Sequence, residues 1–261
     1  MVNIAKVSSI ALGATLGVAF SAAVASASNV FVLTGDRNLV HMDAEALAVT
    51  GAVTVEGGEG RLLGIDVRPA DGLLYGVFED GTVAMIDPET GVATPVSTLS
   101  TMLPSGVVAT VDFNPAADRL RVMGNDGTSL RVNVDTGEVV EDGSHSYAEG
   151  DTTPDVIAGA YTNSFDGTEE TQLFNIDGAA GWLVLQDPPN DGVLNPVGEL
   201  GIEVESVGFD ILSNGAGANN AWLLSGGVLY AVDLESGVAS EVGAVEGDVA
   251  GARDIAILPA Q

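Results

Sequence analysis

Short apolar segments alternate with turn residues along almost the whole chain. The apolar segments are separated by Gly, Asp, Asn and Pro, which is typical of β-strands joined by tight turns. From residue 28 onward, no stretch keeps the 3.6-residue period of a long amphipathic helix. The pattern therefore predicts an all-β protein.

The strand pattern is repeated. Residues 64–91 align without a gap onto residues 110–137, and nine of the 28 aligned positions are identical. Weaker copies occupy residues 157–192 and 207–237. Each copy predicts four strands, with a tight hairpin turn between the second and the third. The predicted hairpin turns are Asp80-Gly81, Asp126-Gly127, Asp177-Gly178 and Gly226-Gly227.

Four strands per repeat, at a spacing of 44 to 49 residues, are typical of a β-propeller. First strands are expected near Ile65, Val111, Ala160, Gly208 and Ile255, which predicts five blades. The strand near Ile255 should be the inner strand of the blade whose outer strands lie within residues 30–55, so that the two ends close the ring. An irregular β-sandwich is the alternative, but it would not explain complementary half-repeats at the two ends.

Several motifs resemble a bacterial exported family of unknown function with propeller-like repeats. They are NPAADRLRV (residues 114–122), LRVNVDTG (130–137), AYTNSF (160–165) and PPNDG (188–192). The resemblance covers about residues 29 to 258. It implies export and a repeat-built β fold, and it implies no activity.

The first 27 residues predict a cleaved signal peptide. Lys6 is followed by an uncharged apolar run over residues 7–24 and by the small residues Ala25-Ser26-Ala27, a pattern that signal peptidase accepts. An uncleaved membrane anchor is the alternative. We expect a single propeller domain over residues 28–261, located in the periplasm or outside the cell and not inserted in a membrane.

Charge and composition exclude several classes of function. Residues 28–261 carry seven arginines and all 37 acidic residues, so their formal charge is −30. Such a surface would repel nucleic acids and anionic membranes. The chain has no Cys, which excludes disulfides and thiolate chemistry. A Ser-His-Asp triad would need His41 or His145, and neither has a nucleophile motif to accompany it.

Three aspartates are the first candidates for chemistry. Asp66 and Asp112 occupy equivalent positions on predicted inner strands, and we assign Asp254 to the same position, with Tyr161 and Gly208 in the other two blades. Three carboxylates at the channel could bind Ca²⁺ or supply the acid and base for glycosidic cleavage. They could instead accept hydrogen bonds from backbone N–H groups at the strand ends. Carboxyls in an open funnel would favour the hydrolase, and bonds to the backbone would count against it.

Three arginines fall in one predicted blade. Arg119, Arg121 and Arg131 could form a fork for a carboxylate, sulfate or phosphate ligand, or they could pair with nearby acids. Because catalytic side chains are scarce, we expect a non-enzymatic module that binds an extracellular protein or a small anionic ligand, or serves as a scaffold. No cofactor is expected except Ca²⁺ on the aspartates. The alternative is a carboxylate-based, Ca²⁺-assisted hydrolase of an extracellular polymer.

Overall fold

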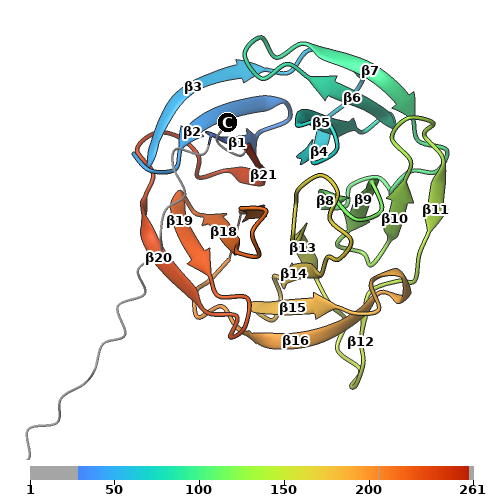
Figure 1. Cartoon of the computed structure of the whole chain (residues 1–261), viewed down its shortest axis with the longest axis vertical. Coiled ribbons are helices and arrows are strands. Elements are labelled where there is room, and N and C mark those ends of the chain that lie inside the picture. Colours follow the sequence, from blue (N-terminus) through green and yellow to red (C-terminus); the bar gives the residue numbers. More distant parts are fainter. Residues whose placement is uncertain (1–28, 205, 259–261) are drawn as a thin grey trace, which may run out of the picture.

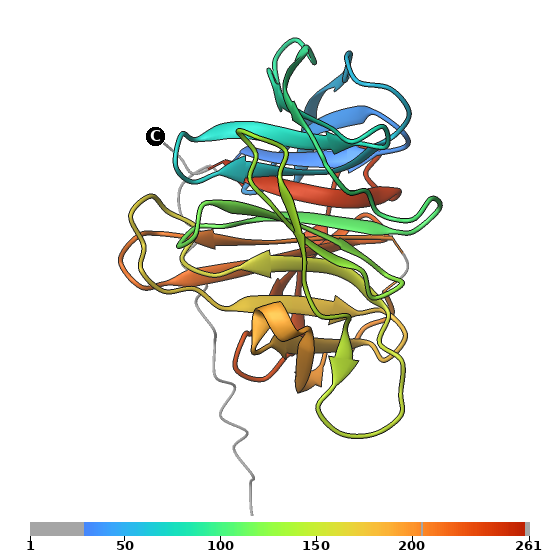
Figure 2. The ribbon, with the colours of Figure 1, turned by 90° about the vertical axis from the view of Figure 1, so that its right-hand side faces the viewer.

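The protein is a ring of five antiparallel β-sheets, as the sequence predicts (Figure 1). The computed structural model describes residues 29–204 and 206–258. The predicted signal peptide lies outside the described residues. Within the described part, the only helix is a 3₁₀ turn at Pro189–Asp191, and no helix is long and apolar enough to span a membrane. From the side, the ring is a disc with loops projecting from both faces (Figure 2).

The strands of each blade are given in order from the inner strand to the outer strand. Blade 1 consists of β21 (Ala252–Leu258), β1 (Asn29–Thr34), β2 (Asn38–Asp43) and β3 (Ala48–Thr54). Blade 2 consists of β4 (Leu62–Arg68), β5 (Leu73–Phe78), β6 (Thr82–Ile86) and β7 (Ala93–Thr98). Blade 3 consists of β8 (Ala109–Asn114), β9 (Arg119–Gly124), β10 (Ser129–Val132) and β11 (Val139–Glu141).

Blade 4 consists of β13 (Val156–Tyr161), β14 (Leu173–Asp177), β15 (Trp182–Gln186) and β16 (Val193–Glu199). Blade 5 consists of β17 (Val207–Ser213), β18 (Asn219–Ser225), β19 (Val228–Val232) and β20 (Ala239–Ala244). A short strand, β12 (Ser146–Tyr147), pairs in parallel with β16 at the outer edge of blade 4, which the repeat pattern did not predict.

The ring closes by pairing the two ends of the chain. Strand β21 pairs antiparallel with β1, with Asn29 opposite Leu258 and Val32 opposite Ile255. The inner strand of blade 1 therefore comes from the C-terminal part of the sequence, and its other three strands come from the N-terminal part. This confirms the predicted closure, because β21 pairs with the edge of β1 and completes the four strands of blade 1.

The core lies between the blades. Each of the five clusters of buried apolar side chains combines residues from two neighbouring blades. Inner strands β4 and β17 are buried at every position, whereas outer strands such as β3 and β20 have exposed residues. The sheets thus stack face against face around the ring, and the inner strands define a narrow centre.

Candidate functional site

Four aspartates occupy the inner strands around the ring centre. They are Asp66 on β4, Asp112 on β8, Asp210 on β17 and Asp254 on β21, and each is only 4 to 6% exposed. Burying a carboxylate costs free energy unless its oxygens are hydrogen-bonded or paired with a cation. The contacts of these four side chains therefore decide what they do.

Each carboxylate accepts a hydrogen bond from the inner strand of the next blade. The Phe113 N–H donates to Asp66 Oδ2 at 2.7 Å, and the Tyr161 N–H donates to Asp112 Oδ1 at 2.9 Å. These bonds join blade 2 to blade 3 and blade 3 to blade 4.

The same arrangement continues on the other side of the ring. The Ile257 N–H donates to Asp210 Oδ2 at 2.7 Å, and the Ile65 N–H donates to Asp254 Oδ2 at 2.9 Å. The carboxylates therefore bond to the backbone of neighbouring blades. Carboxyls in an open funnel would favour a hydrolase, whereas these bonds to the backbone count against it.

The hydrogen-bond register corrects the assignment of equivalent positions. Asp66 bonds to the residue after Asp112, and Asp210 bonds to Ile257, the residue after Ala256. Asp210 is therefore equivalent to Asp66, and Ala256, two residues after Asp254, occupies the corresponding position in blade 1. A shift of two residues keeps a side chain on the same face of a strand, so Asp254 still lies on the face of β21 toward blade 2, where the Ile65 N–H donates to it.

The residues assigned to this position in blades 4 and 5, Tyr161 and Gly208, also need correction. The position equivalent to Asp112 in blade 4 is Ala160, because the neighbouring Tyr161 N–H donates to Asp112 as the Phe113 N–H donates to Asp66. In blade 5 the equivalent residue is Asp210, two residues after Gly208. The tripeptide Gly208-Phe209-Asp210 matches Gly64-Ile65-Asp66, and this signal in the sequence could have identified Asp210.

Three of the carboxylates converge on one point. One oxygen from each of Asp66, Asp112 and Asp210 lies within 4.8 Å of the other two. Within residues 29–204 and 206–258, no arginine or histidine forms an ion pair with any of them. The cluster thus concentrates negative charge without a basic partner.

Burial and mutual repulsion disfavour ionisation of this cluster. Burial, followed by the charge of Asp210, raises the pKa of Asp66 well above its usual value. Burial and the charge of Asp66 do the same to the pKa of Asp112, and burial raises the pKa of Asp210 to about 6. Burial also raises the pKa of Asp254. The group is therefore stabilised by whatever supplies positive charge, either protons or a bound cation.

A cavity opens onto two of these carboxylates at one mouth of the channel. It has a volume of about 310 Å³, and Asp66 and Asp210 line it. Its rim includes the loop residues Ser164, Asp166 and Asn214. These five side chains carry oxygen, and three of them are carboxylates, whereas much of the remaining lining is apolar.

Thr110 adds a buried oxygen on the same face of β8 as Asp112. It is 3% exposed, and its Oγ1 atom has no hydrogen-bond partner among the described residues. Residues two apart on a strand project from the same face, so Thr110 and Asp112 both face blade 4. A buried hydroxyl without a protein partner is unusual, and a bound water or ion is one explanation for it.

The predicted arginine fork forms only in part. Arg121 and Arg131 both contact Asp142, at 2.6 and 3.0 Å, and the Arg121 side chain is 1% exposed. Arg121 also donates to Tyr161, Ser129 and Asn190. Anion binding at these two arginines stays a prediction, and it would require an anion to displace Asp142.

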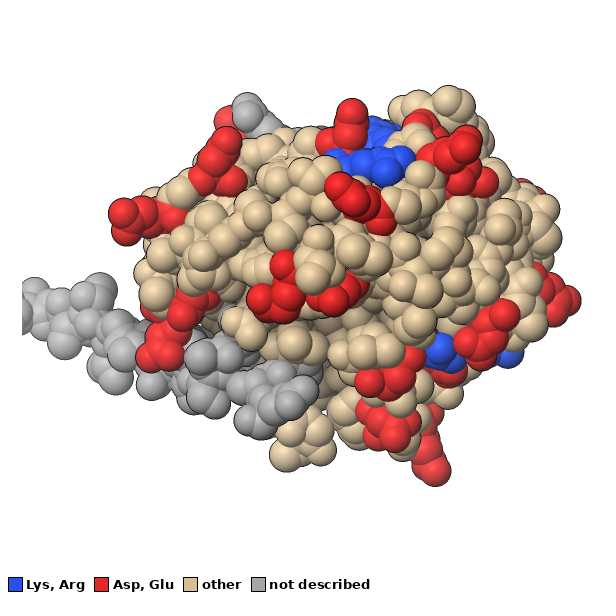
Figure 3. Space-filling model, turned by 90° about the horizontal axis from the view of Figure 1, so that it is seen from above, with Lys and Arg blue, Asp and Glu red and all other residues tan. Residues whose placement is uncertain are grey.

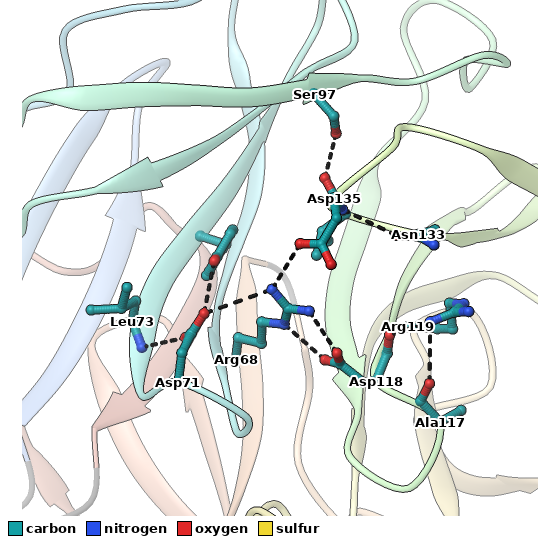
Figure 4. Close-up of polar contacts among 11 residues, drawn as sticks. Arg68, Asp71, Leu73, Ser97, Ala117, Asp118, Arg119, Asn133 and Asp135 are labelled. Carbon is teal, nitrogen blue, oxygen red and sulfur yellow. Dashed lines mark hydrogen bonds and ion pairs between the residues drawn. The ribbon is translucent and has the colours of Figure 1, made fainter.

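Arg119 lies apart from that pair. Its Nη1 donates to the carbonyl oxygens of Ala117 and Asp118 (Figure 4). Beside it, Arg68 of blade 2 reaches Asp118 and Asp135 of blade 3, at 2.5 and 3.2 Å (Figure 4). This network ties two blades together, and its arginine is fully engaged by carboxylates.

The sequence matches the model of a known protein family. The model of one family, the Domain of unknown function (DUF4394), matches residues 38–256. The chain belongs to the DUF4394 family. No curated protein matches it in sequence.

Several solved structures are similar to this DUF4394 protein at low sequence identity. A protein of unknown function from Bacteroides thetaiotaomicron VPI-5482 is 16% identical, with a TM-score of 0.52 over 88% of this chain and 60% of that chain. One from Bacteroides caccae is 16% identical, with a TM-score of 0.44 over 85% and 74%. An auxiliary nutrient binding protein from Bacteroides ovatus ATCC 8483 is 15% identical, with a TM-score of 0.46 over 74% and 55%. Of these three likenesses, the first concerns the fold, because its TM-score is above 0.5. The chain spans less than two thirds of the first and third of these proteins.

Proposed function

We propose that this DUF4394 propeller is a binding module that holds a divalent metal cation, of the class of Ca²⁺, at the floor of the channel-mouth cavity. The ligands we propose are Asp66, Asp112 and Asp210. This set replaces Asp254 of the original prediction with Asp210. The single observation that carries the proposal is the convergence of three buried carboxylate oxygens within 4.8 Å, without a basic partner among the described residues.

The chemistry of the site matches a hard cation. Ca²⁺ binds six to eight oxygen ligands at about 2.3 to 2.6 Å, and carboxylates are its preferred protein ligands. The backbone N–H groups that bond to Asp66 and Asp210 fix these side chains, while each oxygen keeps a second lone pair for a metal. The partner-less Thr110 hydroxyl supports the proposal, because it is a buried oxygen facing the same side as Asp112.

The proposed location of the protein fits weak calcium binding. We propose that the chain is exported, on the basis of the leader-like residues 1–27. Extracellular calcium modules work with dissociation constants of about 10⁻⁴ to 10⁻³ M. A site with three carboxylates, each partly engaged by the backbone, suits that range. The backbone bonds give no support to the hydrolase, so we do not propose it.

Thermal unfolding at matched ionic strength tests the proposal. Because a ligand that binds only the folded state stabilises it by mass action, Ca²⁺ at about 100 times its Kd should raise the midpoint by roughly 5 to 10 °C. Asp112→Asn is the best variant, because only Oδ1 of Asp112 accepts a backbone bond and the asparagine can keep that bond. It should retain the fold and lose most of the calcium shift.

The matched control is Asp177→Asn. Asp177 is also fully buried, and it bonds to Tyr147 and Ala180, far from the cluster in the fold. This variant should keep the calcium shift of the parent protein. The proposal fails if Ca²⁺ raises the midpoint no more than NaCl of equal ionic strength does, or if Asp112→Asn and Asp177→Asn lose the shift equally.

A further inference from the structure

Three arginines gather at the opposite mouth of the ring. Arg37 lies in the turn between β1 and β2, Arg61 immediately precedes β4, and Arg253 lies near the start of β21. The acidic cavity lies at the other ends of these inner strands, beyond Val67 and Ile257. Arg37 and Arg61 line an open depression of about 810 Å³, together with Asn38, Thr54 and Ser105.

The contacts of these arginines are with backbone carbonyl oxygens. Arg37 donates through Nε to Gly60 at 2.7 Å and through Nη1 to Gly57 at 2.9 Å. Arg253 donates through Nε to Gly35 at 2.6 Å. A carbonyl oxygen orients a guanidinium but does not neutralise its charge.

Arg61 is the least engaged of the three. It makes one side-chain hydrogen bond, from Nη2 to the Val107 carbonyl at 3.3 Å. A guanidinium has five N–H donors, so most donors of Arg61 remain available. Arg253 lies close to it, because its Nη2 donates at 2.8 Å to the carbonyl of Leu62, the residue that follows Arg61. Burial, and then the charge of Arg61, lower the pKa of Arg253. Two positive charges therefore lie near each other at this mouth.

Among the described residues, Arg37, Arg61 and Arg253 lack carboxylate partners, as the isolated Arg119 does, but only these three lie together. Arg68, Arg121 and Arg131 all form ion pairs, whereas within the described residues no acidic oxygen lies within 4.0 Å of a nitrogen of Arg37, Arg61 or Arg253. The chain has 37 acidic residues, so partners are abundant. Figure 3 shows basic side chains in small groups, each bordered by acidic ones.

We propose that the depression lined by Arg37 and Arg61, with Arg253 beside it, binds a small oxyanion: a carboxylate, phosphate or sulfate group. The planar fork of a guanidinium matches such groups in geometry and charge. Asp36 and Glu79 also line the depression, and their charges oppose anion binding, so a ligand small enough to contact the arginines without meeting these carboxylates fits best. This site is separate from the proposed cation site, and each can fail without the other.

Titration calorimetry on the whole protein tests this site. The probes are acetate, inorganic phosphate and sulfate, each at one fixed ionic strength, and comparison of the three identifies the preferred group. Arg61→Gln removes one charge and a single 3.3 Å hydrogen bond, so the fold should survive. It should weaken binding of the preferred anion by about tenfold, as expected for the loss of a charge-assisted contact.

Arg119→Gln is the matched control. It removes the same charge from a residue that also bonds only to carbonyl oxygens, at the other end of the blades. Binding should change by less than about twofold, because only long-range charge is altered. The proposal is overturned if no probe binds saturably, or if the two variants weaken binding equally. Circular dichroism melts of both variants verify that the folds are intact.

Discussion

His145 is a buried histidine near the boundary of blades 3 and 4, and its pKa is strongly lowered. Neither ring nitrogen of His145 has a hydrogen-bond partner among the described residues. Burial, followed by the nearby charge of Arg121, lowers its pKa to about 4, while Asp126 acts weakly in the opposite direction. The folded protein therefore keeps this ring neutral where the unfolded chain would protonate it.

This histidine predicts a loss of stability in mild acid. In the unfolded chain its pKa is near 6.5, so between about pH 6.5 and pH 4 the unfolded state binds a proton that the folded state does not. The contribution of His145 to the free energy of unfolding should fall by up to about 3 kcal/mol over that window. Urea unfolding at pH 7, 6, 5 and 4.5 measures it.

His145→Leu isolates this contribution from the many carboxylates that titrate in the same range. Leucine fills a similar volume and cannot be protonated. The variant should lose less stability than the parent protein between pH 7 and pH 4.5, by about the amount assigned to His145. Parallel pH profiles for the two proteins would contradict the assignment.

Among the elements, the connection between blades 3 and 4 shows what the repeat could not predict. The repeat alignment predicts four strands per blade, and the structure confirms this in all five blades. It does not predict that the chain after β11 runs to blade 4 and adds β12 to the edge of β16. That segment is unique to one repeat, so no second copy in the sequence identifies it.

The same segment carries Asp142, and the sequence does not predict that this residue pairs with two arginines. The sequence indicates that Arg121 and Arg131 lie side by side, and the structure pairs them across β9 and β10. Their shared partner comes from outside the predicted strands. The sequence also does not reveal that Ala256, and not Asp254, is equivalent to Asp66. A shift of two residues leaves the alternation of strand residues unchanged, so the pattern is the same in both registers.

Asp142→Asn should strongly destabilise the protein. Asp142 is 5% exposed and contacts two arginines, so its loss leaves the buried charge of Arg121 uncompensated. Breaking a buried ion pair from one side costs about 3 to 5 kcal/mol. Urea unfolding at pH 7 measures the change in the free energy of unfolding.

Asp118→Asn is the comparison for that measurement. Asp118 pairs with Arg68 between blades 2 and 3, but its side chain is 40% exposed. Arg68 keeps Asp71 and Asp135 as carboxylate partners when Asp118 is lost, so this variant should lose far less stability. Similar losses in the two variants would show that burial of Arg121 does not set the cost.

At the scale of the whole molecule, the two proposed sites differ in charge, although acidic side chains line both of them. The acidic cavity lies at one mouth and the arginine depression at the other, on a surface whose formal charge is strongly negative. The five-bladed ring and its closure follow from the sequence because complementary half-repeats can only be completed by pairing the ends. The convergence of Asp66, Asp112 and Asp210 does not follow, because it depends on how blades far apart in sequence meet at the centre.

A crystal structure of the protein grown with Ca²⁺ tests the central claim most directly. We predict one ion at the floor of the channel-mouth cavity, bonded at about 2.3 to 2.6 Å to an oxygen of each of Asp66, Asp112 and Asp210. Anomalous scattering would identify the element. Carboxylates that bond only to the neighbouring backbone at saturating calcium, with no ion between them, would contradict the account.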